Sequence, residues 1–194
     1  MPLGGRGFVT VGAAVACCAL AAACIPEPVP NNTPSPSSAA TTPVETQIER
    51  QMRLDYEGAE EAYRANTSEQ DRLYRAGGST KATSALKATA TGSYLKITLK
   101  SLREVHKSGW HSKGSTKILG IVRDGGWKPG QLGLTSCEDN STIRFFNRSG
   151  EDVTPAVERR YVQKLTVIKV AKRWKVSTAA STRVHSFEGQ PCVA

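Results

Sequence analysis

The sequence has few aromatic residues and lacks three short motifs that mark common enzyme classes. Aromatic side chains make up 6% of its 194 residues. No Gly-rich phosphate loop, Cys-x-x-Cys pair or Gly-x-Ser-x-Gly elbow occurs along the chain. The sequence therefore gives no support for cofactor chemistry.

Long apolar runs are also scarce, and the clearest uncharged run lies near the N-terminus. Residues 8–23, FVTVGAAVACCALAAA, carry no charge and follow a short segment whose only charged residue is Arg6. This pattern is typical of a secretory signal peptide. A membrane-spanning helix is the alternative, but the run is shorter than the roughly 20 apolar residues that a bilayer requires.

Cys24 stands directly after three alanines at the end of this run. The arrangement resembles the lipobox of bacterial lipoproteins, whose cysteine receives a diacylglycerol and becomes the N-terminus after cleavage. Ala21 departs from the Leu, Val or Ile that is most common there. Cys17 and Cys18 are alternative sites, but only about nine apolar residues would precede them. We therefore predict a lipoprotein signal peptide over residues 1–23 and lipidation of Cys24.

Residues 24–44 are rich in Pro, Ser and Thr, with six prolines and a single charged residue, Glu27. Such a segment cannot bury enough apolar surface to offset its conformational entropy. We predict a disordered, semi-extended tether between the lipidated cysteine and a folded domain over residues 45–194.

Two helical sections open the folded domain. The first, from Glu45 to Gly77-Gly78, has an apolar stripe at helical spacing, with Gly58 as a weak point where a neighbour packs closely. The second begins near Ser79 as N-cap and divides at Gly92 into a short and a longer helix, ending near Lys107. The expected buried stripes are Ile48, Met52, Tyr56, Ala59 and Tyr63 in the first section, and Leu86, Ala90, Tyr94, Ile97 and Val105 in the second.

The pattern then changes to runs rich in β-branched and aromatic residues, separated by short turn clusters. Spacers this short favour antiparallel hairpins, because a parallel crossover needs a dozen or more residues. We therefore predict an α+β fold in which N-terminal helices pack on a bent antiparallel sheet. The expected strands are residues 115–124, 131–137, 141–148, 159–172 and 173–187, with CEDN at 137–140 as a turn.

Several segments in this order resemble secreted proteins and lipoproteins of actinobacteria and their phages that have a cystatin-like fold, the cone shared with nuclear transport factor 2 and ketosteroid isomerase. The segments are AYR at 62–64, ATGSYL at 90–95, KGSTKILGIV at 113–122, LTSCEDNSTIRFFNRSGEDV at 134–153, RWKVST at 173–178 and GQPC at 189–192. Lys172 and Arg173 depart from the Asp-Gly pair typical of the last hairpin. The resemblance implies three helices over the concave face of the sheet, with a pocket between the layers.

The cysteine count fits this resemblance. Of five cysteines, cleavage would remove Cys17 and Cys18 and lipidation would use Cys24, so Cys137 and Cys192 remain. An even number of remaining thiols suits a disulfide framework in an exported protein. The resemblance implies that these two are bridged; two unpaired buried thiols are the alternative.

Enzymes on this cone place an Asp, Tyr or His in the pocket, so we name Tyr56, Tyr63, His106 and Asp139 as pocket candidates. Each has a structural alternative: the tyrosines as core, His106 beside a helix C-terminus, and Asp139 capping a turn. His106 and His111 have no familiar metal-ligand spacing. Since no nucleophile, base and orienting group can be assembled, we expect a non-catalytic binding domain. The alternative is a pocket enzyme of the isomerase or hydrolase type.

Positive charge is concentrated in the C-terminal part of the chain. The formal net charge is +9, and residues 76–194 hold 20 basic and eight acidic side chains. A basic domain outside a membrane attracts anionic lipid head groups and envelope polymers. We expect the protein at the outer face of the cell membrane, with anionic envelope polymers or another envelope protein as further partners and surface exclusion of phages as a role implied by the resemblance. No nucleic-acid motif is present, and a solvated basic surface is the alternative.

Replacement of Cys24 tests the predicted anchor. The wild-type protein should incorporate radiolabelled palmitate and stay with membranes in high salt, because two acyl chains suffice for stable anchoring. Cys24→Ala should accumulate as an unlabelled precursor, whereas Cys17→Ala and Cys18→Ala should be processed normally. A cleaved, soluble Cys24→Ala protein would show an ordinary signal-peptidase site; a labelled one would move the anchor to Cys17 or Cys18.

Overall fold

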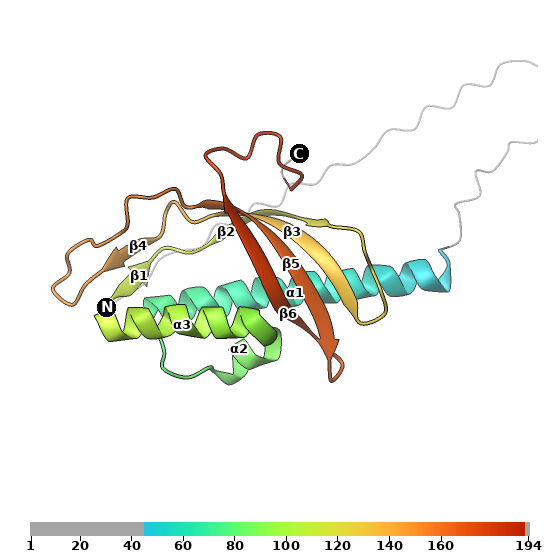
Figure 1. Cartoon of the computed structure of the whole chain (residues 1–194), viewed down its shortest axis with the longest axis horizontal. Helices are drawn as coiled ribbons and strands as arrows, with labels where there is room; N and C mark the ends of the chain where they lie inside the picture. Colours follow the sequence, from blue (N-terminus) through green and yellow to red (C-terminus); the bar gives the residue numbers. More distant parts are fainter. Residues whose placement is uncertain (1–44, 193–194) are drawn as a thin grey trace, which may run out of the picture. The chain divides into compact units, whose positions relative to one another are not determined.

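The computed structural model describes residues 45–192, in which three helices lie on one face of a four-stranded antiparallel sheet. Figure 1 shows the helices on one side of the curved sheet. The α+β prediction is confirmed. The predicted signal peptide, the tether and Cys24 lie outside the described residues.

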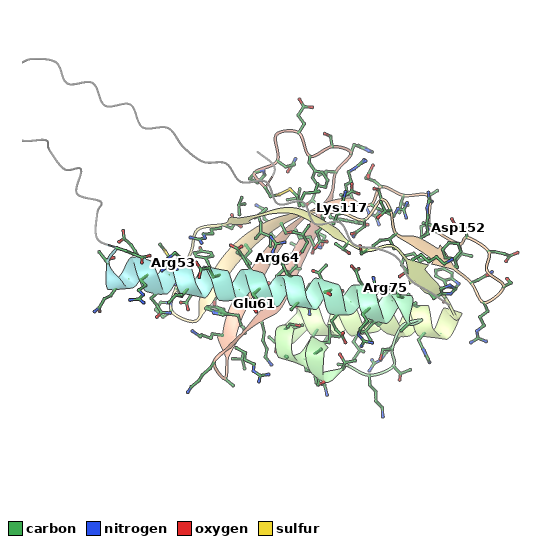
Figure 2. All side chains as sticks on the ribbon, turned by 180° about the vertical axis from the view of Figure 1, so that it is seen from behind. Arg53, Glu61, Arg64, Arg75, Lys117 and Asp152 are labelled. Atoms are coloured by element: carbon green, nitrogen blue, oxygen red, sulfur yellow. A yellow bond between two sulfur atoms is a disulfide. The ribbon has the colours of Figure 1, made fainter. Side chains whose placement is uncertain are left out.

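Helix α1 (Gln47–Arg75) is the longest element and begins with a capping box. Thr46 Oγ1 accepts a hydrogen bond from the Glu49 backbone N–H at 3.2 Å, and Glu49 Oε2 accepts one from the Thr46 N–H at 2.8 Å. Gly77 and Gly78 follow with positive φ, as expected for the end of a helix. Charged residues, four of them labelled in Figure 2, are spaced along the helix: Arg53, Glu61, Arg64 and Arg75.

The predicted stripe on α1 is correct from Tyr56 onward and wrong at its first residue. Tyr56, Ala59 and Tyr63 are buried, Met52 packs against the same core, and Ile48 is 70% exposed. The first turns of α1 extend beyond the sheet (Figure 1), so no neighbouring layer covers Ile48.

Two further corrections concern the second helical section, which forms α2 (Ser84–Thr89) and α3 (Gly92–Ser108). The N-cap is Thr83, whose hydroxyl accepts from the Leu86 N–H at 3.1 Å, whereas the Ser79 hydroxyl donates to the Lys81 carbonyl. Ile97 is 65% exposed. The predicted Val105 is buried together with Thr98 and Leu102, and Ile97 lies outside the face of α3 that these three residues share.

The main sheet has the order β2-β3-β5-β6, formed by β2 (Lys117–Arg123), β3 (Gln131–Asp139), β5 (Arg160–Val170) and β6 (Arg173–Arg183). A two-residue turn joins β5 to β6, and both of its residues, Ala171 and Lys172, have positive φ. This is the backbone of a type I′ hairpin, which matches the twist of paired strands.

The predicted strand at 141–148 is only partly correct. It shortens to β4 (Arg144–Phe146), which pairs with β1 (His111–Lys113) in a separate two-stranded ladder. The four-stranded sheet passes from β3 to β5 without it. This small ladder therefore extends the fold beyond the sheet rather than widening it.

The main core lies between α1 and the sheet, where Tyr56, Ala59 and Tyr63 meet apolar side chains of β3, β5 and β6. Gly58 lies against the indole of Trp174 on β6: a Cβ added to Gly58 would be 2.7 Å from Trp174 Cδ1. Gly58 therefore allows the close helix–sheet contact expected from the sequence.

Asp55 is buried beside this contact and accepts hydrogen bonds from three side chains. Gln51 donates at 2.9 Å, the Trp127 indole N–H at 3.1 Å and Lys169 Nζ at 3.3 Å. A buried carboxylate with this many donors is compensated, so we assign Asp55 a structural role.

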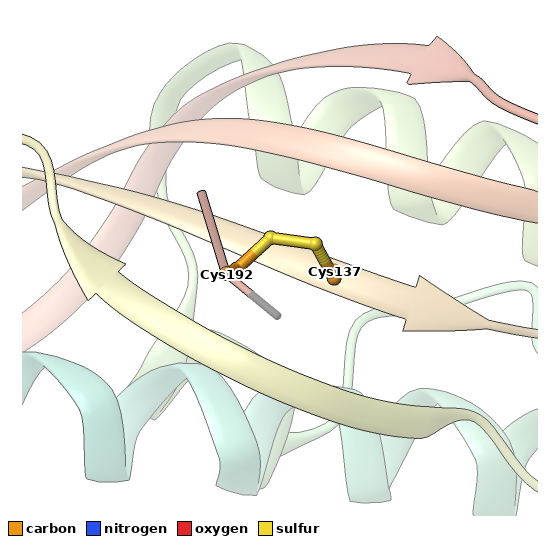
Figure 3. Close-up of a disulfide and its surroundings, with 2 residues drawn as sticks. All are labelled: Cys137 and Cys192. Carbon is orange, nitrogen blue, oxygen red and sulfur yellow. A yellow bond between two sulfur atoms is a disulfide. The ribbon is translucent and has the colours of Figure 1, made fainter. Parts of the chain in front are cut away.

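The opposite face of the sheet is covered in part by the C-terminal tail. Cys192 forms a disulfide with Cys137 of β3, with a Cα–Cα distance of 5.7 Å (Figure 3), which confirms the predicted pair. Cys137, Val162 and Cys192 form a separate buried cluster. Closing a loop of this length is worth roughly 4 kcal/mol in the chain-entropy model.

None of the helices within residues 45–192 has both the length and the apolar character needed to cross a membrane.

The Gly58–Trp174 contact predicts that a Gly→Ala substitution, which normally stabilises a helix, destabilises this protein. In an exposed helix, Gly→Ala gains about 1 kcal/mol. Gly58→Ala should instead destabilise the protein by about 1–3 kcal/mol, because the new methyl group displaces the indole. Denaturant unfolding measures the difference, with Ala65→Gly on the exposed face of α1 as the control for helix propensity. A gain in stability for Gly58→Ala would contradict the contact.

Candidate functional site

A pocket of about 260 Å³ lies beyond the apolar core, between α1 and α3 on one side and β3, β5 and the β1–β4 ladder on the other. Its lining residues are mostly polar or aromatic. They are Thr67, Gln70, Asp71, Tyr74, Tyr94, Ser112, Thr116, Glu138, Asn140, Ile143, Phe145, Arg159, Tyr161 and Gln163.

A second hollow of about 370 Å³ adjoins this pocket and shares six of its lining residues, among them Tyr94, Asn140 and Gln163. Exposed Ile97 and Ser181 also line this hollow. The hollow therefore lies between the pocket and the surface of α3 and β6.

Glu138 is the most deeply buried carboxyl group in the pocket, with 4% of the residue exposed. It receives one hydrogen bond on each carboxylate oxygen: the Tyr63 hydroxyl donates to Oε1 and the Gln163 amide donates to Oε2. These donors come from α1 and β5, so Glu138 joins the helix layer to the sheet at the pocket wall.

Burial changes the acid–base behaviour of this pair. Desolvation raises the pKa of Glu138, the hydrogen bonds from Tyr63 and Gln163 oppose the shift, and nearby Asp71 adds to it. The pKa of the Tyr63 phenol is raised well above its usual value, first by desolvation and then by the charge of Glu138. Tyr63 is thus held as a neutral donor.

Asp71 is the second carboxylate at the pocket and has its own partners. The Thr116 backbone N–H donates to Oδ2 at 2.8 Å and the Thr116 hydroxyl to Oδ1 at 2.9 Å. These bonds attach the segment before β2 to α1.

Aromatic side chains form much of the remaining wall. Tyr74 and Phe145 meet edge to face with ring centroids 6.1 Å apart. The Tyr94 hydroxyl accepts from the Gln70 amide at 3.0 Å, and burial raises the pKa of Tyr94. Tyr161 completes the wall on β5.

Among residues 45–192, Arg159 is the only basic residue that lines the pocket, and its guanidinium supports a loop. It donates to the carbonyl oxygens of Ser141, at 3.0 Å, and Ile143. Asn140, at the start of the same loop, has a buried Oδ1 with no hydrogen-bond partner among residues 45–192. The loop thus brings the free acceptor of Asn140 to the pocket, whereas the Arg159 guanidinium already donates hydrogen bonds to the loop.

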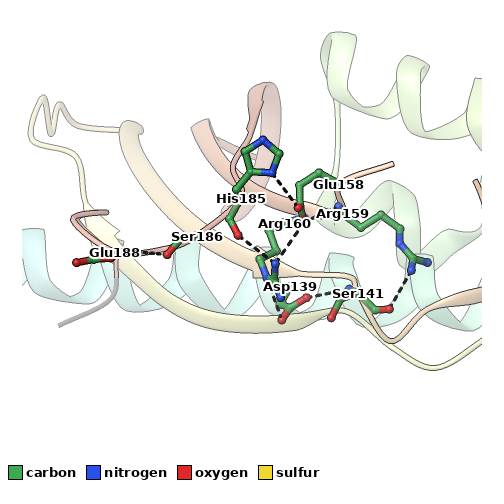
Figure 4. Close-up of polar contacts among 8 residues, drawn as sticks. All are labelled: Asp139, Ser141, Glu158, Arg159, Arg160, His185, Ser186 and Glu188. Atoms are coloured by element: carbon green, nitrogen blue, oxygen red, sulfur yellow. Dashed lines mark hydrogen bonds and ion pairs between the residues drawn. The ribbon is translucent and has the colours of Figure 1, made fainter. Parts of the chain in front are cut away.

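The four residues proposed from the sequence do not themselves line this pocket. Tyr56 donates to the Gly125 carbonyl at 3.2 Å, and His106 is exposed near the end of α3. Asp139 accepts from the Ser141 N–H at 2.8 Å and lies 3.8 Å from Arg160 (Figure 4), so it caps a turn. Tyr63 comes nearest, because its hydroxyl donates to Glu138.

Glu138 was missed because the strand was expected to end at Cys137. In the structure β3 continues to Asp139, and Glu138 stays in the ladder opposite Tyr161. Alternation along this strand carries the missing signal: Leu132, Leu134, Ser136 and Glu138 are all buried on the helix-facing side. Extending that period by two residues would have placed the carboxyl group inside.

Among residues 45–192, no cluster of three His, Cys, Asp or Glu side chains is arranged to hold a metal ion.

Comparison with known proteins identifies no family for this chain. No family model matches it, and no curated protein matches it. The intermembrane-space region of the chloroplast protein ARC6 superimposes with a TM-score of 0.45 at 14% identity, covering 65% of this chain and 95% of that one. A de novo designed β-sheet protein superimposes with a TM-score of 0.34 at 14% identity, covering 64% and 89%.

The raised pKa of Glu138 predicts a loss of stability as pH rises. The folded state holds this proton more tightly than the unfolded chain, so the contribution of the group to stability falls from about pH 4.5 up to its folded pKa and then levels off. Glu138→Gln removes the effect. We expect its melting temperature relative to wild type to increase across this range.

Thermal unfolding followed by circular dichroism between about pH 4 and pH 8 measures this difference. Glu61→Gln, which removes an exposed carboxyl group from α1 (Figure 2), controls for the loss of one negative charge. If the difference in melting temperature between wild type and Glu138→Gln stays constant with pH, the prediction is wrong.

Proposed function

We propose that this protein is an extracytoplasmic lipoprotein, anchored through Cys24, whose folded domain binds a small molecule in the pocket at Glu138. The observation that carries the proposal is a buried carboxyl group at the wall of a cavity, whose two donors, Tyr63 and Gln163, are uncharged. Asp55 has the Lys169 ammonium group as a partner, whereas no residue of the described part of the chain forms an ion pair with Glu138, and burial of a charge without such a pair costs free energy. Such groups are more common at functional sites than elsewhere.

The disulfide supports the location. Structural disulfides persist in oxidising compartments and are rare in the cytoplasm of most organisms. The Cys137–Cys192 bridge therefore agrees with export by the predicted signal peptide. In this proposal the domain is of the cystatin-like, nuclear-transport-factor-2-like type found in actinobacterial and phage lipoproteins.

A basic hairpin supports contact with an anionic envelope. Residues 164–175, which form most of β5 and the turn into β6, contain five basic side chains and no acidic one, and four of the five remain when Lys169, which pairs with Asp55, is set aside. Lys172 and Arg173 at the turn are exposed. Lipid head groups, anionic polymers or an acidic envelope protein are partners for this surface, and their binding should weaken with salt.

Catalysis is the second candidate, favoured by one observation. A carboxyl group with a raised pKa, beside a phenol and facing a cavity, has the properties of a general acid. Binding remains our first choice because both Glu138 oxygens already accept hydrogen bonds.

A fragment screen by thermal shift tests the binding proposal on the full mature chain in detergent. Ser112 is buried and lines the pocket, so Ser112→Leu should fill part of it. We expect some fragments to stabilise wild type by a few degrees, as ligand linkage requires, and to have no effect on Ser112→Leu.

Ser108→Leu, the same change at an exposed position at the end of α3, should behave as wild type. If no fragment distinguishes Ser112→Leu from Ser108→Leu, the pocket is not a binding site. If mass spectrometry shows a bound fragment converted, and Glu138→Gln stops the conversion, the protein is an enzyme.

A further inference from the structure

We propose that the pocket at Glu138 selects a small organic ammonium ion, bound by the carboxylate and enclosed by aromatic rings. This inference rests on the proposed binding function and names the ligand class. Three features of the pocket carry it: the balance of its charges, the state of its hydrogen-bonding groups, and its aromatic wall.

Charge in the pocket favours a cationic ligand even though the chain as a whole is basic. Two carboxyl groups, Asp71 and Glu138, line it together with one guanidinium, that of Arg159. Arg159 donates to the carbonyls of Ser141 and Ile143, which commits two of its N–H groups to the loop. An anionic ligand would therefore meet two carboxyl groups and a guanidinium that already donates to the loop.

The hydrogen-bonding groups favour a ligand that donates. Each oxygen of Glu138 accepts one hydrogen bond and retains a second lone pair. Asn140 adds an acceptor with no partner among the described residues. A primary ammonium group brings three donors and one positive charge, and so satisfies acceptors that an alcohol, with one donor and no charge, satisfies only in part.

The wall suits the same ligand. Tyr74, Tyr94, Phe145 and Tyr161 line the pocket from α1, α3, the β4 strand and β5. The faces of aromatic rings attract cations, and the attraction grows when the cation is desolvated. The combination of a carboxylate and several rings is a common way to bind ammonium groups.

Size restricts the ligand further. The volume of about 260 Å³ is below the roughly 300–1,000 Å³ of sites for drug-sized molecules. A single ring carrying an aminomethyl group is of suitable size. Long polyamines and large lipids would extend beyond the pocket into the adjoining hollow.

Isothermal titration of the full mature chain in detergent with three compounds of the same shape tests the inference. The probes are benzylammonium, benzyl alcohol and benzoate, each also titrated into protein-free detergent. We expect benzylammonium to bind at least about tenfold more tightly than the other two, since charged hydrogen bonds exceed neutral ones by about this factor. Glu138→Gln should abolish the preference.

Glu61→Gln provides the matched control, because it removes an exposed carboxyl group from α1 and should keep the preference. Ser112→Leu should weaken the binding of benzylammonium, and this result would place the ligand in the pocket. Circular dichroism of Glu138→Gln verifies its fold, and Glu138→Asp, which keeps the charge, should retain a preference for the cation.

Three other outcomes would contradict the proposal. Equal binding of the alcohol and the ammonium ion, or tighter binding of benzoate, would reject a cation site while leaving the binding function intact. Absence of benzylammonium binding would also reject the cation site. The fragment screen with Ser112→Leu would show separately whether the pocket binds any other small molecule. A preference that survives in Glu138→Gln would place the cation elsewhere.

Discussion

The hydrogen bond from Tyr63 to Glu138 joins the helix layer to the sheet at the place where the interior changes from apolar to polar. On one side of it, α1 packs on leucines and valines of the sheet. On the other side lies a cavity lined by acceptors and rings. Because an unpaired buried carboxylate is strongly unfavourable, Tyr63 and Gln163 must stay in place for the two layers to remain packed around it.

Other contacts hold the structure together away from the pocket. Gly58 lets α1 approach Trp174 closely, and Asp55 binds Lys169 and Trp127 beside that contact. The disulfide holds the tail on the opposite face of the sheet. The contacts at Gly58 and Asp55 thus hold the helix layer on the sheet, and the pocket lies beyond them.

The cation inference and the basic surface assign different partners to different parts of the domain. Positive side chains lie on the β5–β6 hairpin, where solvent screens them and many anions can bind. The pocket has two carboxyl groups and one guanidinium, in a less solvated environment where the electrostatic interaction of each charge is stronger. A basic exterior and an acidic pocket thus allow contact with an anionic envelope and binding of a cation in one small domain.

The sequence by itself determined that the helices precede the strands of the main sheet, because helix and strand periodicities are local properties of the chain, but it did not predict β1. It predicted the stripe from Tyr56 to Tyr63, the close contact at Gly58 and the pair Cys137 and Cys192, each of which the structure confirms. It also determined the expectation of a lipid anchor at Cys24, which rests on an N-terminal pattern alone. Local patterns suffice for such features, since they need no knowledge of what lies opposite.

Only the tertiary structure determined where the pocket forms and whether residues near the ends of helices and strands are buried or exposed. Ile48 is exposed because the sheet ends before it, and Ile97 because it lies outside the buried face of α3 formed by Thr98, Leu102 and Val105. Alternation along β3 places Glu138 inside the fold, but only the tertiary structure makes it a site residue, because its partners Tyr63 and Gln163 lie 75 and 25 residues away. A carboxyl group becomes a binding group only when folding removes its water and supplies distant donors, and no local pattern records that.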